Sequence, residues 1–455
     1  MAGGSPTSGG GVQVERNGNQ KYGFALTLMV SLFFMIGFIT VLNDVLIPSL
    51  KGVFELTNVQ AMLIQFCFFG AYFVWSYPAG MLIKKVGYKK GLMLALVIMG
   101  IGLLLFVVAA MVLSYGVFLF ALFVVASGLT LLQVAINPYI IALGPEETGA
   151  SRLNLGGALN STATFIGPIL GGAFILKHFV ESDFASNEAF HHAQADAVKG
   201  PYIVLALLTI GIAVALYFMK LPVIQTASEE EKAEGSSFEY LHNILGAGAI
   251  FFYVGAEVAI GSLLILYLAE ESMGAIEEKM ASSLLAYYWG SAMIGRFVGS
   301  AIGKKVKANK LLAAVTVVAL ALVGLSMMNF TLTSWTDISV MILNTEGGFS
   351  MTFEPVHIPI AAFLLVLVGL FNSVMWPAIF PLGIAKLGKH TSQGTGFMVM
   401  MVAGGAFIPL FQGWLADSIG FKASFIVCIA CYAYILFFAL KGYKMGKISE
   451  EHDVE

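Results

Sequence analysis

Residues 22–49 read YGFALTLMVSLFFMIGFITVLNDVLIPS, an apolar run in which Asp44 is the single charged residue. A helix that crosses a bilayer needs about 20 mostly apolar residues, so this run is predicted to span a membrane. A carboxylate at that depth costs about 2.5–3.5 kcal/mol on insertion scales, and such residues normally face a water-filled cavity. The sequence therefore predicts that Asp44 lines a polar cavity and that the rest of the chain builds the wall around it.

The composition of the 455-residue chain is that of an integral membrane protein. It is 58% hydrophobic and 11% charged, whereas a soluble protein is about 25% charged. The net charge of −3 comes without a basic arm, so no nucleic-acid partner is expected. Cys67, Cys428 and Cys431 lie in apolar runs, which indicates buried thiols rather than a disulfide framework. No His/Cys cluster has the spacing of metal ligands, and neither a cofactor nor a resident metal is expected.

Twelve apolar segments are long enough to cross a bilayer. They predict an all-α membrane protein with twelve transmembrane helices, over residues 22–49, 59–83, 91–113, 115–143, 154–177, 201–219, 238–268, 281–304, 310–331, 357–385, 391–415 and 419–440.

The distribution of lysine and arginine sets the predicted orientation. With the N-terminus in the cytoplasm, 18 of the 24 basic residues lie inside, 5 lie outside and Arg296 lies within a helix. An even number of helices returns the C-terminus to the cytoplasm as well. Two long loops, 178–200 and 332–356, are then external.

The two halves of the chain resemble each other. Phe33–Gly37 corresponds to Phe251–Gly255 at an offset of 218 residues, and further matches follow at offsets of 219 and 239. The loop 332–356 accounts for the extra length. Six plus six helices in parallel repeats, joined by a cytoplasmic linker, describe the major facilitator architecture of two six-helix bundles. The predicted parts are a disordered N-terminus 1–21, a first bundle 22–220, a linker 221–237, a second bundle 238–441 and a tail 442–455.

Particular motifs are similar to one subfamily, the fucose–galactose–glucose symporters. The turn Gly80–Lys90 resembles the general major facilitator motif between helices 2 and 3. The stretches similar to the subfamily are Leu42-Asn43-Asp44, Ala135-Ile136-Asn137-Pro138, Arg152-Leu153-Asn154-Leu155 with Asn160, Tyr253-Val254-Gly255, Gly295-Arg296-Phe297, Pro377-Ala378-Ile379-Phe380 and Leu382-Gly383-Ile384. The resemblance runs through nearly all twelve segments and implies a sugar transporter of a bacterial inner membrane.

The chain departs from these patterns at three positions, one in the general motif and two relative to fucose permease. Lys84 stands where the general motif has an Asp that takes part in gating, and Gln133 stands where fucose permease has a glutamate. Glu257 stands where fucose permease has an amide. With Glu257, the segment resembles the glucose/galactose branch of the family, some members of which are described as sodium-dependent.

A sugar presents hydroxyl groups and apolar ring faces, so its site needs amides, carboxylates and aromatic platforms. Buried amides must also be paired, with a sugar, with water or with each other. Each amide therefore either binds substrate or joins helices, at about 0.6 kcal/mol per bond. Gln133 and Asn137 are four residues apart and share one helix face. The predicted substrate-binding residues are Asn43, Asp44, Gln65, Gln133, Asn137, Asn160, Glu257, Tyr288, Asn372 and Trp376.

Asp44 and Glu257 are the predicted cation-coupling residues. A carboxyl group in a low-dielectric site favours being neutralised, either by a proton or by Na⁺ held with neighbouring oxygens. Two roles are open for Arg296, pairing with an acid in the core or snorkelling or gating at the cytoplasmic end, and the structural role is favoured.

The prediction is therefore cation-coupled symport, with Na⁺ or H⁺, of glucose- or galactose-type hexoses by a monomeric protein whose partners are the sugar and membrane lipid. Fucose, mannose or an amino sugar is an alternative substrate. A drug or organic-ion antiporter would have a more apolar cavity, and a nutrient sensor would usually add a signalling tail. No nucleophile–base set indicates an enzyme.

Overall fold

A computed structural model describes residues 13–14, 23–144, 149–176, 184, 186–219, 221–222, 224–225, 235–303, 306–328, 335–345, 349–387 and 390–446. Most of the predicted N-terminus, linker and tail therefore lies outside the described residues. Two short strands are described in these regions: Gln13–Val14 (β1) of the N-terminus pairs antiparallel with Ile224–Gln225 (β2) of the linker.

The first set of helices follows from the apolar runs of the N-terminal half. Its members are α1 (Gly23–Phe54), α2 (Asn58–Ala61), α3 (Leu63–Val86), α4 (Tyr88–Val112), α5 (Tyr115–Ala142), α6 (Gly149–Phe174) and α7 (Asn187–Phe218). Met62 joins α2 to α3, so the two form one crossing.

The second set has more interruptions. Its members are η3 (Ser237–Glu239), α8 (Leu241–Leu268), η4 (Glu271–Met273), α9 (Glu278–Gly303), α10 (Ala308–Met327), α11 (Ile360–Asn372), α12 (Met375–Ile384), α13 (Thr391–Met400), η6 (Met401–Ala403), α14 (Gly404–Ile419), α15 (Phe421–Ser424), α16 (Ile426–Leu440) and η7 (Gly442–Lys444). The pairs α11–α12, α13–α14 and α15–α16 each form one crossing.

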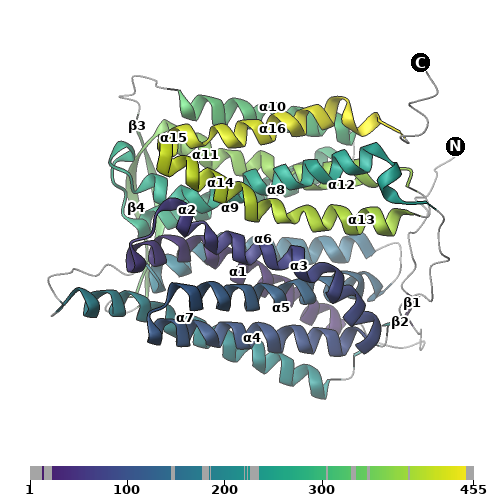
Figure 1. Cartoon of the computed structure of the whole chain (residues 1–455), viewed down its shortest axis with the longest axis horizontal. Coiled ribbons are helices and arrows are strands. Elements are labelled where there is room, and N and C mark those ends of the chain that lie inside the picture. The colour runs from purple at the N-terminus through teal and green to yellow at the C-terminus, as the bar shows by residue number, and fades with distance from the viewer. Residues whose placement is uncertain are drawn as a thin grey trace.

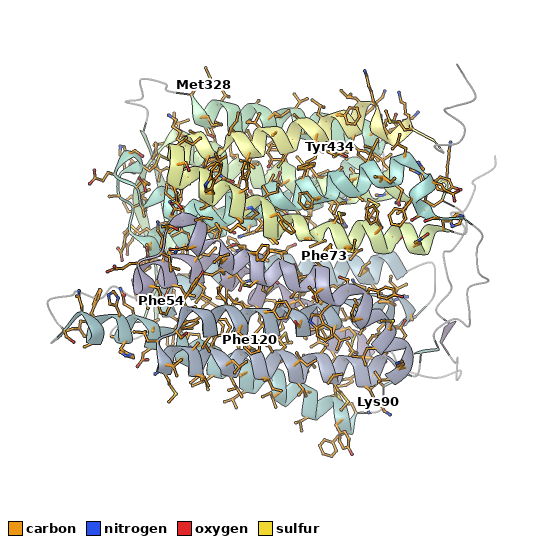
Figure 2. All side chains as sticks on the ribbon, in the orientation of Figure 1. Phe54, Phe73, Lys90, Phe120, Met328 and Tyr434 are labelled. Atoms are coloured by element: carbon orange, nitrogen blue, oxygen red, sulfur yellow. The ribbon has the colours of Figure 1, made fainter. Side chains whose placement is uncertain are left out.

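Within the described residues the helices thus make the twelve predicted crossings, and ten of these are long and apolar enough to span a membrane. The other two are α6 and α9. The helices lie side by side with the first set below and the second set above (Figure 1). Apolar side chains such as Phe73 and Phe120 project from the surface of the bundle (Figure 2), as expected for a face in contact with lipid.

Two predicted external loops contain regular structure. Helix α7 begins at Asn187, inside the predicted loop 178–200, because Ser186 caps it by accepting a hydrogen bond from the Ala189 amide. Strands β3 (Trp335–Asn344) and β4 (Ser350–Pro359) form an antiparallel hairpin that begins in the predicted loop 332–356 and continues three residues into the predicted crossing 357–385, which as a helix starts at Ile360. In this hairpin, buried residues such as Val340 and Ile342 alternate with more exposed ones, the period of a half-buried strand.

The hairpin defines one end of the bundle, here called the hairpin end; the end that carries Lys90 is called the basic end (Figures 1 and 2). The hairpin belongs to the second set and is tied to α9. Ser283 Oγ donates to the Met341 carbonyl oxygen at 2.8 Å, and Tyr287 OH donates to that of Ser339 at 2.8 Å. Its Phe349 ring also meets the ring of Phe174 from α6, with centroids 6.2 Å apart. The hairpin therefore contacts both sets.

Candidate functional site

A cavity of about 200 Å³ lies between the two sets of helices. Residues of α1, α3, α5 and α6 form one wall, and residues of α8, α9 and η6 form the other. The polar lining residues are Thr40, Asp44, Gln65, Tyr72, Gln133, Asn160, Thr164, Glu257, Trp289 and Arg296. Arg296 is itself exposed, and it lies toward the Gly303 end of α9, on the side of the basic end.

Asp44 lies on α1, is 4% exposed and is surrounded by hydrogen-bond donors. Its Oδ1 accepts from Gln65 Nε2 at 2.9 Å and from Ser262 Oγ at 2.8 Å, and its Oδ2 accepts from Trp289 Nε1 at 3.3 Å. Donors strengthen their bonds when the acceptor is ionised, so this arrangement suits a carboxylate. Gln65 Oε1 is buried and has no partner among the described residues, which leaves one oxygen beside Asp44 for a ligand.

Glu257 lies on α8 and faces the same cavity. Its Oε2 accepts from Tyr253 OH at 2.9 Å, one helical turn away, while its buried Oε1 has no hydrogen-bond partner in the described part of the chain. Arg296 is within Coulombic range of Glu257 and donates from Nη1 to Ser161 Oγ. Arg296 therefore contributes positive charge to the cavity, in agreement with the alternative in which it faces an acid in the core.

Two amides of the first set also line the cavity. Gln133 on α5 donates from Nε2 to Tyr72 OH at 3.0 Å, and Asn160 on α6 donates from Nδ2 to the Phe33 carbonyl oxygen at 3.1 Å. These bonds fix the amides by their nitrogen atoms, and none of the described residues donates to their oxygens, which are left for other donors. The hydroxyl groups of a sugar are such donors.

Five of the ten predicted binding residues thus line the cavity, and five lie elsewhere. Asn43 is buried with an unpartnered Nδ2 among the described residues, and Asn137 is exposed, one turn from Gln133. Tyr288 lies behind Glu257 and donates to its carbonyl oxygen at 3.0 Å. Trp376 stacks on Phe380. Asn372 lies deeper behind the cavity in a buried network, where its Nδ2 donates to Tyr288 OH at 3.1 Å and its Oδ1 accepts from Tyr432 OH.

That network gives a stability prediction. Asn372 Oδ1 accepts from Tyr432 OH at 2.8 Å, and both residues are fully buried. We expect Asn372→Leu to lower the free energy of unfolding by about 1–3 kcal/mol, because the Tyr432 hydroxyl loses its acceptor. Thermal unfolding of purified protein in detergent measures the loss. Adding Tyr432→Phe should recover most of it, and no recovery would contradict a hydrogen-bond origin.

Ser262 and Tyr253 were not predicted as site residues, whereas Tyr72 and Trp289 were among the aromatic residues that the sequence offered as possible partners of a sugar. A signal for Ser262 was present, since it lies 218 residues after Asp44, the offset that relates Phe33–Gly37 to Phe251–Gly255. Asp44 and Ser262, which are hydrogen-bonded to each other, therefore occupy equivalent positions of the internal repeat. Nothing in the sequence distinguishes Trp289 from the other aromatic residues near it.

Two carboxylates and several amides in one cavity, enclosed between two sets of membrane helices, define a secondary transporter. The chain belongs to the Major Facilitator Superfamily, whose family model matches residues 28–358, and this is a family of transporters rather than enzymes.

Similar proteins agree with this assignment. The chain is 44% identical to a glucose/galactose transporter of Brucella abortus over 95% of this chain and 97% of the relative. It is 32% identical to the L-fucose-proton symporter of Escherichia coli over 94% and 95%. The crystal structure of FucP in its outward conformation aligns with a TM-score of 0.66 and 31% identity over 92% of this chain and 99% of that one. A bacterial homologue of the transporter Spinster, inward-facing, shares the fold with a TM-score of 0.69 and 14% identity over 94% and 98%.

Proposed function

We propose that the protein is a cation-coupled sugar symporter that takes up hexoses of the glucose and galactose type. The observation that carries the proposal is the meeting of Asp44 and Glu257 with the amides Gln133 and Asn160 in one cavity. The substrate class rests on the 44% identical relative, which is named a glucose/galactose transporter. Fucose is the second candidate, because the 32% identical relative is named a fucose symporter. The polar lining disfavours a drug antiporter.

The cavity offers both kinds of surface that a hexose needs. The oxygens of Gln133 and Asn160 provide acceptors on one wall, and the Trp289 ring provides an apolar platform on the other. A site built to hydrogen-bond hydroxyl groups rejects analogues that lack them, because its own polar groups are then left unpaired.

Asp44 is the proposed coupling residue. Its three donors stabilise the ionised form, and the unpartnered Gln65 Oε1 adds an oxygen at the same point. Na⁺ would be held by the Asp44 carboxylate with the oxygens of Gln65 and Ser262, whereas H⁺ would be taken up by the carboxylate itself. Either cation neutralises the cavity, which allows it to close and to reopen on the other side.

The proposed orientation places the basic end in the cytoplasm of a bacterial inner membrane, because the lysines gather there. The two bundles, 22–220 and 238–441, then act as the rocking halves of a monomer. In this proposed orientation the Arg296 side of the cavity lies toward the cytoplasm.

Sugar counterflow in proteoliposomes tests the substrate class without any coupling ion gradient. Liposomes loaded with unlabelled glucose should take up labelled glucose, and external galactose should compete. Competition by fucose or mannose, without competition by galactose, would indicate that the substrate is one of these alternative sugars. No counterflow with any hexose would contradict sugar transport.

Gln133→Leu should raise the KM for sugar by about ten-fold, because one sugar hydroxyl loses its acceptor at about 1.4 kcal/mol. Counterflow measured over a range of glucose concentrations gives this KM. Asn137→Leu is the matched control, since Asn137 lies one turn away and outside the cavity. An equal effect of both substitutions would contradict the assignment of Gln133.

A further inference from the structure

The turn that follows α14 repeats the turn that follows α3. Residues 80–89 read GMLIKKVGYK and residues 413–422 read GWLADSIGFK, an offset of 333. The backbones agree as well, with φ 80° and ψ 164° at Gly87 and φ 85° and ψ 156° at Gly420. Each of these glycines donates its N–H to the carbonyl oxygen four residues earlier. The first turn lies at the basic end and the second at the hairpin end (Figure 1).

The fifth position of the repeat is Lys84 in the first copy and Asp417 in the second. The Asp417 carboxylate reaches from the second set of helices to the first. Its Oδ1 accepts from the Asn58 amide at 2.9 Å, and its Oδ2 accepts from the Val59 amide at 2.8 Å. These N–H groups lie in the first turn of α2, where no intrahelical acceptor exists. A carboxylate in this place forms charge-assisted bonds and also complements the helix dipole.

The glycines of the repeat show how closely the two sets approach at each end. A Cβ added at Gly413 would lie 2.9 Å from the Asn58 carbonyl oxygen and 2.8 Å from Met62 Cγ, so α14 and α2 meet at backbone distance. A Cβ at Gly80 would meet no heavy atom within 4 Å beyond its own helix and chain neighbours, among the described residues. The helices are therefore in contact at the hairpin end, while the equivalent glycine at the basic end faces open space.

Lys51 adds to the contact from the first set. Its Nζ donates to Asn58 Oδ1 at 2.6 Å and lies within Coulombic range of Asp417. A positive charge from one set therefore faces the carboxylate of the other, around the same two backbone amides.

We propose that Asp417 and Gly413 form a latch that holds the hairpin end closed, and that both Asp417 bonds break each time the cavity opens to that side. Asp417 is a positioning residue, since it contacts neither the cavity nor its contents. At the basic end the equivalent position of the repeat is Lys84, so this copy of the turn does not supply the carboxylate. The empty transporter is therefore biased toward the state that is closed at the hairpin end.

Labelling of a cavity cysteine from outside tests the latch without any substrate. The reporter is Thr40→Cys, which lines the cavity, in a variant whose three native cysteines are alanine. Intact cells receive a membrane-impermeant maleimide, which reaches the reporter only when the hairpin end opens. Asp417→Asn should raise the labelling rate about ten-fold, equivalent to about 1.4 kcal/mol. Gly413→Ala should raise it as well, because the added methyl group separates α14 from α2.

Matched controls isolate the latch. Glu271→Gln removes one exposed carboxylate near the same end, and Gly80→Ala adds one methyl group at the equivalent glycine; both should label at the parental rate. Ser350→Cys on the exposed hairpin should label in every variant, and its failure to label would refute the proposed orientation rather than the latch. The latch proposal would be contradicted if Asp417→Asn labelled at the same rate as the parent, or if the control variants showed equal increases in the labelling rate. If the Asp417→Asn protein does not accumulate in the membrane, the latch is tested by comparing the labelling rate of Gly413→Ala with that of Gly80→Ala.

Discussion

Asp44→Asn is expected to abolish sugar accumulation while sugar-for-sugar exchange continues. The carboxamide keeps one oxygen, which can accept from Gln65 and Ser262 in place of Oδ1, whereas its NH2 group replaces the Oδ2 that accepts from Trp289. It carries no charge to be neutralised. The cavity then resembles its cation-loaded form permanently and can change state without the cation. One cation moving through 100 mV supplies about 2.3 kcal/mol, equivalent to about a 50-fold sugar gradient. In Asp44→Asn the internal sugar concentration should rise only to the external concentration.

Parallel measurements of gradient-driven uptake and counterflow in the same proteoliposomes check this prediction. Asp337→Asn on the exposed face of the hairpin serves as the control for loss of one carboxylate, and it should behave as the parent. Full accumulation by Asp44→Asn would remove Asp44 from the coupling mechanism.

Glu257→Gln should have the other large effect, and it should impair exchange as well as accumulation. Glutamine keeps an acceptor for Tyr253 but leaves the charge of Arg296 without its counter-charge in the cavity. We expect counterflow to fall by at least about ten-fold, since an imbalance of 1.4 kcal/mol suffices for that factor. The initial rate of labelled glucose counterflow is the measurement.

The double variant Glu257→Gln with Arg296→Gln distinguishes charge balance from a direct loss of substrate contact. Restored exchange in the double variant would assign Glu257 to charge balance with Arg296. Exchange that stays low would assign Glu257 to sugar binding. Parental accumulation by Glu257→Gln alone would remove Glu257 from the transport cycle.

The crossings and the position of Asp44 could be predicted because a bilayer leaves few alternatives. A chain in lipid must satisfy its backbone within helices, so each apolar run of sufficient length predicts one crossing. A lone carboxylate in such a run is too costly unless it faces a polar space. The same reasoning predicted Glu257, which the structure places in the cavity with Asp44.

Which amides face the cavity could not be predicted, because helix rotation and depth are set by packing between helices. Gln133 and Asn137 share one face of α5, yet Gln133 lines the cavity and Asn137 is exposed one turn away. Asn43 is adjacent to Asp44 and points elsewhere, since successive helix residues are about 100° apart. Asn372 satisfies Tyr432 instead, a contact between residues 60 apart that no local pattern indicates.

The loops were the least predictable part of the fold. The hairpin of β3 and β4 lies in a segment that was predicted only as a long external loop, because hydropathy identifies membrane crossings and does not distinguish a strand from an irregular loop outside them. Likewise, Ser186 and the alanines that follow it form a helix beyond the apolar run that predicted α7. In both places, short-range propensity decided the structure where hydropathy gave no signal.

Labelled glucose uptake into proteoliposomes tests the central claim most directly, with an imposed Na⁺ gradient in one set and an imposed pH gradient in the other. Cation-coupled symport predicts accumulation above equilibration with one of the two gradients, and its loss in Asp44→Asn. Na⁺-driven uptake would place Na⁺ at Asp44, Gln65 and Ser262, and pH-driven uptake would place the proton on Asp44. Uptake that only equilibrates under both gradients, in protein that performs counterflow, would contradict symport and indicate a facilitative carrier.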